Sequence, residues 1–397
     1  MARIGIYGGT FNPPHVGHLR AARYAISALG LEKLLLIPSC IAPHKKLPLD
    51  TPSPMQRAQM VQIAAGEKME VSSIELDRGG TSFTYETVEA LRSQYPNDEL
   101  VLFMGTDMFL SFFTWREPNR ILQNASLGVF YRGDKNELER IAAQKKQTEN
   151  DGATVYLVEN PVTNISSTQL RRMLIFGCAD SFLPAGVLDY IKDNGLYGTN
   201  RSYRNLPMEE LEQVVVDLVK PGRVPHVLGC RDTAIKLAEH WGADVNDAAR
   251  AGLLHDITKA LDGPLQLTLC REYGKMLDAF SENNPKVLHA LTGSMVAQRV
   301  FGENAAVVDA ICSHTTGKPN MNLLEKIIYI ADYIEPNRDF PGVEKLRDLA
   351  YTDLDESVLA GLETAIAHLQ EQGSEISPVG LETLAWFAGK RKEKTVC

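Results

Sequence analysis

The feature that most constrains the fold of this chain is a glycine-rich turn between a short apolar run, residues 3–7, and a helical pattern, residues 19–29. The turn reads Gly8-Gly9-Thr10-Phe11-Asn12-Pro13-Pro14-His15-Val16-Gly17-His18. Glycines let the backbone approach an anion closely, and the N-terminus of the next helix directs N–H groups at it. His15 and His18 are three residues apart, so both rings can face one site and donate to oxygens that gain negative charge. The alternative is a strand-to-helix turn with two surface histidines, but the combination favours phosphoryl or nucleotidyl transfer.

This stretch resembles the nucleotidylyltransferases that carry an HxGH signature, and its Asn-Pro-Pro-His is most similar to bacterial nicotinate-mononucleotide adenylyltransferase. The resemblance implies transfer of the adenylyl group of ATP to nicotinate mononucleotide, with release of pyrophosphate and with Mg²⁺ accompanying the ATP. It covers residues 1–198. The glycine turn, from Gly8 to Asn12, would bind nucleotide, and His15 and His18 would act on the phosphates.

The first half alternates short β-rich runs with helical stretches, which predicts a doubly wound parallel sheet with helices on both faces, a Rossmann-like α/β fold. Ligands bind beyond the carboxyl ends of such strands, so the motifs there should share one site. The predicted strands are 3–7, 33–38, 70–76, 99–104, 127–131 and 154–158.

Further candidate binding residues follow in chain order. Lys45 lies in a Pro-His-Lys-Lys loop and, by the resemblance, contacts phosphate, whereas Arg57 is either a further binding residue or a surface charge. Thr84 lies at the start of a helix, where capping of the helix and recognition of the nicotinate carboxylate are both expected roles and are compatible with each other. Gly105 and Asp107 form the Gly-x-Asp element that the resemblance places at the nucleotide.

Two later motifs complete the first half. Trp115 belongs to an aromatic cluster, and the resemblance implies that it stacks on the nicotinate ring, while core packing is the alternative. Ser166, Ser167 and Arg171 stand at the start of a helix, where hydroxyls either cap the helix or, with backbone N–H groups and the guanidinium, bind phosphate. The resemblance to Ile-Ser-Ser-Thr-x-x-Arg favours phosphate binding.

Near residue 200 the β-rich runs end and apolar residues recur at helical spacing, which predicts a domain boundary and an all-α helical bundle. We expect a first domain at 1–198, a linker at 199–206 and a second domain at 207–397. The predicted helices include 232–241, 245–261, 287–300, 323–334 and 354–372.

Histidines and carboxylates from several helices can converge in such a bundle to bind two metal ions, with one carboxylate bridging them. Each of these histidines by itself could be an ordinary core residue. The candidate ligands are His226, His255, Asp256, His289, His314 and Asp332.

The order of these ligands resembles HD-domain phosphohydrolases, and more narrowly the bacterial HD family that splits diadenosine tetraphosphate symmetrically into two ADP. The resemblance implies two transition-metal ions, iron in that family. Asp256 would serve catalysis as well as the metals, and Lys259, one turn later, either approaches phosphate or is solvated.

Composition limits the remaining function classes. The net charge of −9 argues against broad nucleic-acid binding, and the six cysteines form no CxxC pair, which fits a reducing cytoplasm. No apolar run is long enough to cross a bilayer, so we expect a cytoplasmic protein with no membrane partner. The sequence leaves open a homo-oligomer.

Two alternatives remain at this point. The first domain could use nicotinamide mononucleotide or phosphopantetheine as its acceptor. The second could be a metal-containing module that senses dinucleotides and regulates the first without hydrolysing them.

Overall fold

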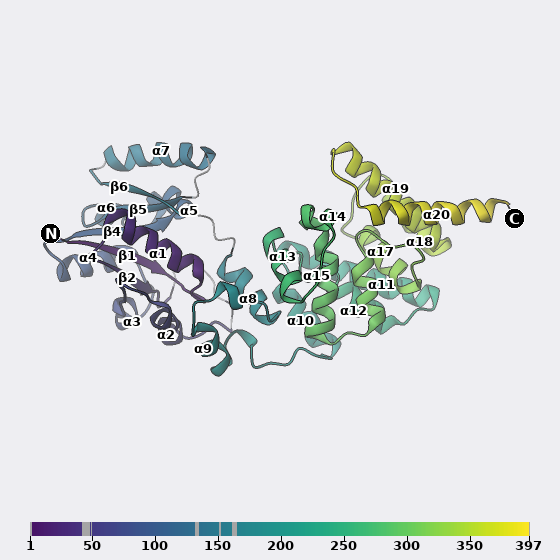
Figure 1. The fold of residues 1–397 in the computed structure, drawn as a ribbon, viewed down its shortest axis with the longest axis horizontal. Helices are drawn as coiled ribbons and strands as arrows, with labels where there is room; N and C mark the ends of the chain where they lie inside the picture. Colours follow the sequence, from purple (N-terminus) through teal and green to yellow (C-terminus); the bar gives the residue numbers. More distant parts are fainter. Residues whose placement is uncertain are drawn as a thin grey trace. The chain divides into compact units, whose positions relative to one another are not determined.

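The chain divides into two compact units, Met1–Arg201 and Ser202–Cys397 (Figure 1). The structure is a computed structural model that describes residues 2–41, 48, 50–131, 135–150, 152–160 and 165–396. The division between the units falls within the segment 199–206 for which the sequence predicts a linker.

The first unit contains a six-stranded sheet in the order β3-β2-β1-β4-β5-β6, with every adjacent pair parallel. This is a doubly wound order, in which the direction of winding reverses between β1 and β4. It confirms the predicted fold class. The strands are β1 (Arg3–Gly9), β2 (Lys33–Pro38), β3 (Met69–Val71), β4 (Glu99–Gly105), β5 (Ser126–Tyr131) and β6 (Val155–Glu159).

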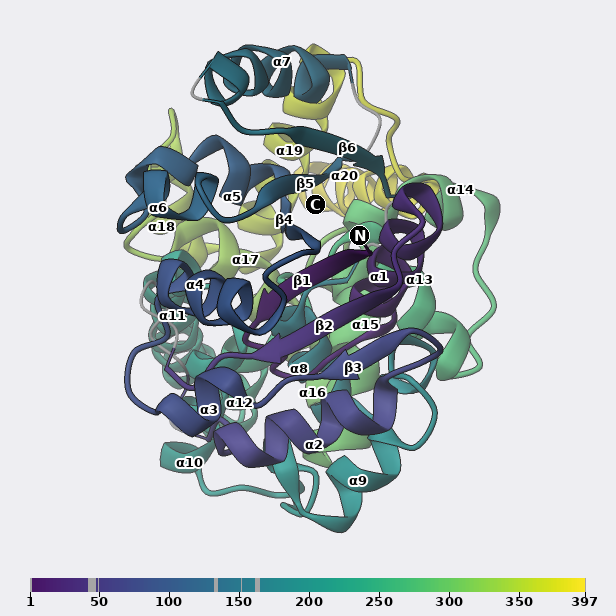
Figure 2. The ribbon, with the colours of Figure 1, turned by 90° about the vertical axis from the view of Figure 1, so that its left-hand side faces the viewer.

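Helices flank the sheet, as Figure 2 shows. Helix α1 buries Ala21, Ala22 and Ala25, small residues that let it lie close to its neighbours. It ends at Leu29, and Gly30 follows as its C-cap with a φ of 58°, which suits glycine. The helices of this unit are α1 (Val16–Leu29), α2 (Pro54–Ala64), α3 (Ile74–Arg78), α4 (Thr84–Gln94), α5 (Thr106–Leu110), α6 (Pro118–Leu122), α7 (Lys135–Asn150), α8 (Ser167–Ile175) and α9 (Val187–Asp193).

The predicted strand 70–76 is too long. β3 ends at Val71, and the backbone N–H of Ser72 makes the last bond to the sheet, to the carbonyl of Leu36 at 2.9 Å. The next residues begin α3, where the Ser73 hydroxyl donates to Asp77 at 2.7 Å. Serine side chains compete for local hydrogen bonds and so favour helix starts over strand interiors.

The second unit consists of helices and connecting turns within the residues described, in agreement with the predicted all-α bundle. Its α-helices are α10 (Met208–Leu218), α11 (Val224–Trp241), α12 (Val245–Leu254), α13 (Gly263–Glu272), α14 (Ala279–Asn283), α15 (Leu288–Val296), α16 (Ala305–Ser313), α17 (Leu323–Ile334), α18 (Val343–Thr352), α19 (Leu354–Glu371) and α20 (Pro378–Val396).

Two predicted helices of this unit are interrupted. The predicted helix 245–261 ends at Leu254, and tight turns follow, in which the N–H of Ile257 bonds to the carbonyl of Leu254 at 3.1 Å. The predicted helix 287–300 becomes a π-helical turn at Ala297–Phe301. Apolar residues continue through both interruptions, so hydrophobic spacing alone does not reveal them.

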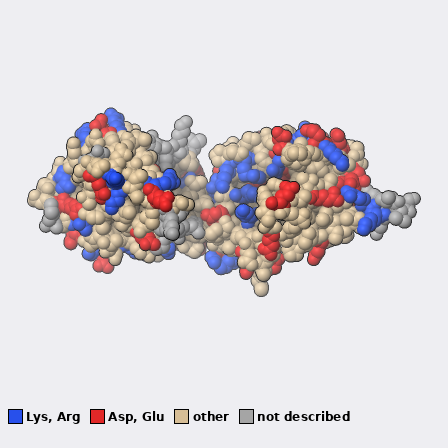
Figure 3. All heavy atoms as spheres, turned by 90° about the horizontal axis from the view of Figure 1, so that it is seen from above, with Lys and Arg blue, Asp and Glu red and all other residues tan. Residues whose placement is uncertain are grey.

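None of the helices that the structure describes combines the length and the apolar character that spanning a bilayer requires. On the face drawn in Figure 3, acidic and basic side chains both occur on each unit.

Candidate functional site

The glycine turn of the first unit lies at the switch point of its sheet, where β1 ends at Gly9 and β4 ends at Gly105. A cavity of about 400 Å³ opens there. The predicted site residues on its wall are Gly8, Gly9, Thr10, His18, Thr84, Gly105 and Trp115. A second cavity of about 370 Å³ is lined by His15, His18, Gly105 and Asp107, among others. His18 and Gly105 therefore border both cavities.

The two histidines of the turn are in contact. Their ring centroids are 3.7 Å apart, and the backbone N–H of His15 donates to Nδ1 of His18 at 3.2 Å. Because that nitrogen accepts a hydrogen bond, we assign the proton of neutral His18 to Nε2. Burial lowers the pKa of His15 to about 4, so its imidazole is neutral at pH 7.

Phe11 packs against His18. Its ring is buried and meets the ring of His18 edge to face, with 5.1 Å between centroids. A side chain on Gly9 would crowd the Phe11 ring, since an added Cβ would lie 3.2 Å from its nearest atom. Phe11 thus supports the turn through packing.

A buried arginine fixes the start of the turn. Arg57 is 1% exposed and donates through Nη1 to the carbonyl of Thr10 at 2.6 Å. Its Nη2 donates to the carbonyl of Ser39 at 2.7 Å, just after β2. Arg57 is therefore no surface charge. It joins the ends of two strands, a role that no motif in the sequence reveals.

Side chains from near the C-terminal end of the first unit bind the middle of the glycine turn. Arg171 donates through Nη1 to the carbonyl of Asn12 at 2.8 Å, and the Ser167 hydroxyl donates to the carbonyl of Pro13 at 3.2 Å. The hydroxyl of Tyr197 donates to Oδ1 of Asn12 at 2.8 Å. Predicted phosphate-binding residues thus lie beside the glycine turn, and Tyr197 is an additional support.

Ser166 is the N-cap of α8, and its hydroxyl accepts from the backbone N–H of Gln169 at 3.2 Å. Ser166 therefore caps its helix, as one of the two interpretations of the sequence predicted. The remaining N–H groups of the first turn of α8 keep the electropositive character of a helix N-terminus.

Thr84 and Trp115 share the larger cavity. The prediction that Thr84 caps its helix is wrong, because Phe83 is the N-cap of α4 and makes no side-chain capping bond. Trp115 is half-buried, with its ring centroid 5.5 Å from that of Phe112. Its side chain contacts both the hydrophobic core and the cavity.

Lys45, the predicted phosphate-binding lysine of the first unit, lies outside the described residues.

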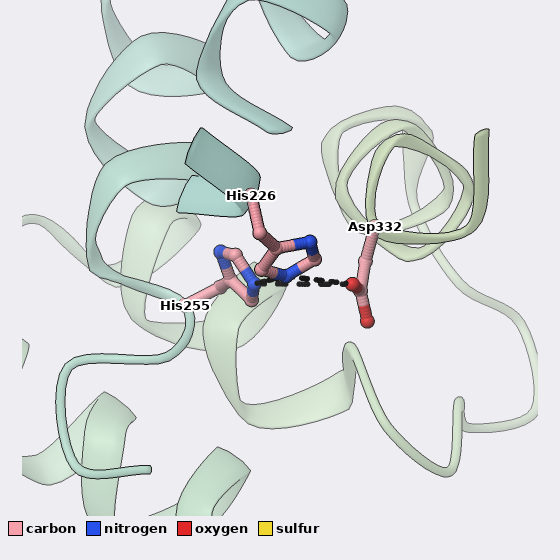
Figure 4. Close-up of side chains that lie close together, drawn as sticks. All are labelled: His226, His255 and Asp332. Atoms are coloured by element: carbon pink, nitrogen blue, oxygen red, sulfur yellow. Dashed lines mark hydrogen bonds and ion pairs between the residues drawn. The ribbon is translucent and has the colours of Figure 1, made fainter. Parts of the chain in front are cut away.

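The second unit brings its six predicted ligands together from five places in the bundle. His226 comes from α11 and Asp332 from α17, while His255 follows α12 (Figure 4). Nε2 of His226 is 3.2 Å from Nε2 of His255 and 3.2 Å from Oδ1 of Asp332. These three residues form one group whose ligand atoms lie within 4.8 Å of one another.

Asp256 lies between this group and two further imidazoles. Its Oδ2 is 3.6 Å from Nε2 of His226 and 3.5 Å from Nε2 of His255. Its Oδ1 is 3.5 Å from Nε2 of His289, on α15, and 3.8 Å from Nε2 of His314, after α16. Each oxygen of one carboxylate therefore faces a different pair of imidazole nitrogens.

Backbone carbonyls orient three of the imidazoles. Nδ1 of His255 lies 2.7 Å from the carbonyl of Gly252, Nδ1 of His314 lies 2.7 Å from that of Ile311, and Nδ1 of His289 lies 2.8 Å from that of Lys286. If each Nδ1 donates, each Nε2 keeps its lone pair for the site, an arrangement typical of metal-binding histidines.

The fourth imidazole is oriented by a carboxylate that the sequence did not single out. Nδ1 of His226 is 3.1 Å from Oε1 of Glu335, which is 1% exposed. Glu335 also accepts from the backbone N–H of Asn337 at 2.8 Å. The sequence did contain a signal for Glu335, because the stretch Ala-Asp-Tyr-Ile-Glu-Pro at 331–336 places a second acidic residue three positions after Asp332.

Charges at this centre shift the pKa values of its histidines. Burial lowers the pKa of His226, but Asp256, Asp332 and Glu335 outweigh it and raise the pKa to about 9. Burial lowers the pKa of His289 to about 3 and that of His314 to about 4. The carboxylate side of the centre therefore attracts a cation, and the other side offers neutral imidazoles.

Three cationic side chains border the centre. Arg223 pairs with Oδ2 of Asp256, and Arg338 pairs with Oδ1 of Asp332. The ammonium of Lys259 lies 2.8 Å from Nε2 of His289. The nitrogen and oxygen donors fit transition-metal ions, which imidazole and carboxylate groups bind well. The surrounding cations suit an anionic substrate.

Comparisons with known proteins agree with this division of the chain. Residues 6–173 match the cytidylyltransferase-like family, and residues 223–337 match the HD domain family. A symmetrical bis(5'-nucleosyl)-tetraphosphatase of Bacillus subtilis (strain 168) is 38% identical over 181 residues, which are 45% of this chain and 96% of that protein.

A probable nicotinate-nucleotide adenylyltransferase of Dictyoglomus thermophilum is 38% identical over 198 residues, which are 49% of this chain and 99% of that protein. A crystal structure described as a predicted HD superfamily hydrolase involved in NAD metabolism, from Clostridium acetobutylicum, is 36% identical with a TM-score of 0.46. It covers 47% of this chain and 98% of that one. The chain therefore belongs to the cytidylyltransferase-like family through its first unit, alongside nicotinate-nucleotide adenylyltransferases, and to the HD domain family through its second, alongside symmetrical bis(5'-nucleosyl)-tetraphosphatases.

Proposed function

We propose that this chain is a bifunctional enzyme. Its first unit transfers the adenylyl group of ATP to nicotinate mononucleotide, which yields nicotinate adenine dinucleotide and pyrophosphate. Its second unit hydrolyses diadenosine tetraphosphate to two ADP. The similarity of each unit to proteins named for these activities supports the assignment. The observation that carries the first activity is the His15–His18 pair at the switch point, and the second rests on Asp256 between four imidazoles.

In the first reaction, a phosphate oxygen of nicotinate mononucleotide forms a bond to the α-phosphorus of ATP, and the bond from that phosphorus to the bridging oxygen of pyrophosphate breaks. The protein's contribution is alignment and stabilisation of charge on the phosphate oxygens. Nε2–H of His18 and the ring of His15 donate to these oxygens. Lys45, Ser167 and Arg171 hold the phosphates, and Mg²⁺ would accompany ATP.

The two cavities suit the two ends of the product. Thr84 and Trp115 border the larger cavity, where a flat ring could stack and a carboxylate could meet a hydroxyl and loop amides. Asp107 borders the other cavity, where its carboxylate could accept from ribose hydroxyls. His18 and Gly105 border both, so the phosphates would lie between the nucleosides.

In the second unit, His226, His255 and Asp332 would hold one metal ion, and His289 and His314 would hold the other. Asp256, which has one oxygen facing each set of imidazoles, would serve both. Two such ions, iron in the family that the sequence resembles, would supply hydroxide near neutral pH and would neutralise phosphate oxygens. The chain's own cations, Arg223, Arg338 and Lys259, would bind the polyphosphate.

The hydrolysis breaks the central bridge of the tetraphosphate. An oxygen from water bonds to one of the two middle phosphorus atoms, the bond from that atom to the central bridging oxygen breaks, and each half leaves as ADP. Glu335 keeps the His226 ring oriented by holding its Nδ1.

Acceptor specificity tests the first assignment. Purified full-length chain should form product with ATP and nicotinate mononucleotide at a kcat/KM well above those for nicotinamide mononucleotide and phosphopantetheine. An equal or higher value for either alternative would reject nicotinate mononucleotide as the acceptor.

Product analysis tests the second. The same preparation, supplied anaerobically with ferrous iron and diadenosine tetraphosphate, should produce ADP alone. Tight binding without ADP would instead support the nucleotide-sensing alternative. AMP and ATP together would show asymmetric cleavage and contradict the proposed reaction.

A further inference from the structure

The ammonium of Lys259 lies beside Nε2 of His289, the nitrogen that the proposed metal centre needs as a ligand. Its ammonium is 2.8 Å from Nε2 of His289 and 3.2 Å from Nδ1 of the same ring. Nδ1 is already occupied, since it lies 2.8 Å from the carbonyl of Lys286. Nε2 is therefore the ring atom that remains for a metal ion, and a cation of the protein is next to it.

A metal ion and this ammonium would repel each other. An ion bound to an imidazole lies about 2 Å from the nitrogen, which would place it within about 5 Å of the Lys259 ammonium. His289 is 3% exposed, so water screens this repulsion weakly. The long lysine side chain can relieve it by rotating, because its ammonium is bound to no carboxylate at hydrogen-bond distance among the described residues.

We propose that Lys259 and the second metal ion compete for His289, and that metal binding transfers the Lys259 ammonium from His289 to a phosphate oxygen of the substrate. This inference rests on the proposed dinuclear site. It orders the assembly of the active centre, because Lys259, one of the three cations proposed to bind phosphate, becomes available to the substrate only when the metal ion is in place. Thermodynamic linkage makes the effect reciprocal, so phosphate must also tighten binding of the second metal ion.

Metal titrations of the full-length chain test this exchange. We would titrate Co²⁺ into the metal-free protein and follow both heat and the visible absorbance of the bound ion. Lys259→Met removes the competing charge and should bind the second Co²⁺ about ten-fold more tightly than the unaltered chain in phosphate-free buffer, the lower end of the effect that residues beside metal ligands have on affinity. Lys275→Met removes the same charge from an exposed position of the second unit and should leave both affinities unchanged.

Inorganic phosphate provides the second half of the test. It should tighten the second Co²⁺ site more in the unaltered chain than in Lys259→Met, since only the former has an ammonium to transfer. Lys259→Gln, with a neutral polar side chain of similar length, should behave like Lys259→Met, which guards against a folding defect in one variant.

The outcomes separate this inference from the function on which it rests. Two Co²⁺ ions bound with unchanged or weaker second-site affinity in both neutral variants would reject the exchange and leave the dinuclear site in place. A single ion bound by the unaltered chain and by both variants would reject the dinuclear site itself.

Discussion

The backbone N–H of His15 donates to Nδ1 of His18 at 3.2 Å, so one histidine of the glycine turn sets the tautomer of the other. The bond leaves the proton of His18 on Nε2. The sequence placed two imidazoles in one turn, but the structure gives them different environments. His15 is buried and neutral, while His18 borders both cavities.

Replacement of His18 by Ala should lower the kcat of adenylyl transfer by about 10²–10³, the cost of removing one preorganised donor to developing charge. The measurement is steady-state formation of the dinucleotide from ATP and nicotinate mononucleotide. Hydrolysis of diadenosine tetraphosphate by the same preparation is the internal control and should not change. Full transferase turnover in a folded His18→Ala protein would remove His18 from the mechanism.

Replacement of Arg57 by Met should destabilise the first unit by about 3 kcal/mol, because the partly buried carbonyl of Thr10 and the buried carbonyl of Ser39 lose their donor. Amide hydrogen exchange in β1 and β2 reports this loss locally. Arg20→Met, at an exposed position of α1, is the matched control. Unchanged protection of β1 in Arg57→Met would show that the guanidinium does not hold the strand ends.

Acid should weaken the first unit through His15. Its folded pKa of about 4 lies below the usual value of 6.5, so the unfolded chain binds the proton more tightly between these pH values. Stability is therefore lost as the pH falls from about 6.5 to about 4, by about 2 kcal/mol between pH 7 and pH 5. Hydrogen exchange in β1, corrected for intrinsic rates, measures this slope. His15→Asn should flatten it, and the same slope in both proteins would contradict the assignment to His15.

Changing Asp256 to Ala should abolish ADP formation, because the carboxylate between the two pairs of imidazoles is gone. Metal analysis should find fewer than two ions per chain. Adenylyl transfer should persist, since its residues belong to the other unit. Equal loss of both activities in a folded protein would show that the two sites are not independent.

Glu335→Gln should lower metal affinity by about 10-fold, because it removes the negative charge beside Nδ1 of His226 while keeping an acceptor there. Competition with a chelator measures the affinity. Glu344→Gln, at an exposed position on α18, is the control for loss of one acidic group. Equal metal affinity in Glu335→Gln and in the unaltered chain would show that the charge of Glu335 does not contribute to metal binding.

Much of the candidate site was predictable because its residues belong to local motifs. The glycine turn, His15 and His18 follow β1 directly, and His255 with Asp256 forms a single dipeptide. The residues of each motif lie within a few positions of one another, so their spacing in the sequence reveals the motif. The limits of the strand at 70–76 and of the helix at 245–261 were wrong, because hydrophobic spacing does not report where local hydrogen bonds end an element.

The two fold classes and the candidate residues of each site follow from the sequence, since period, turn residues and motif order are local properties of the chain. The distant groups that support these candidates became visible in the folded protein alone. Arg57 reaches a carbonyl 47 positions away, Glu335 reaches His226 across 109 positions, and Tyr197 reaches Asn12 across 185. Such contacts arise because a buried polar group must find a partner wherever packing brings one, and that partner has no fixed distance along the sequence.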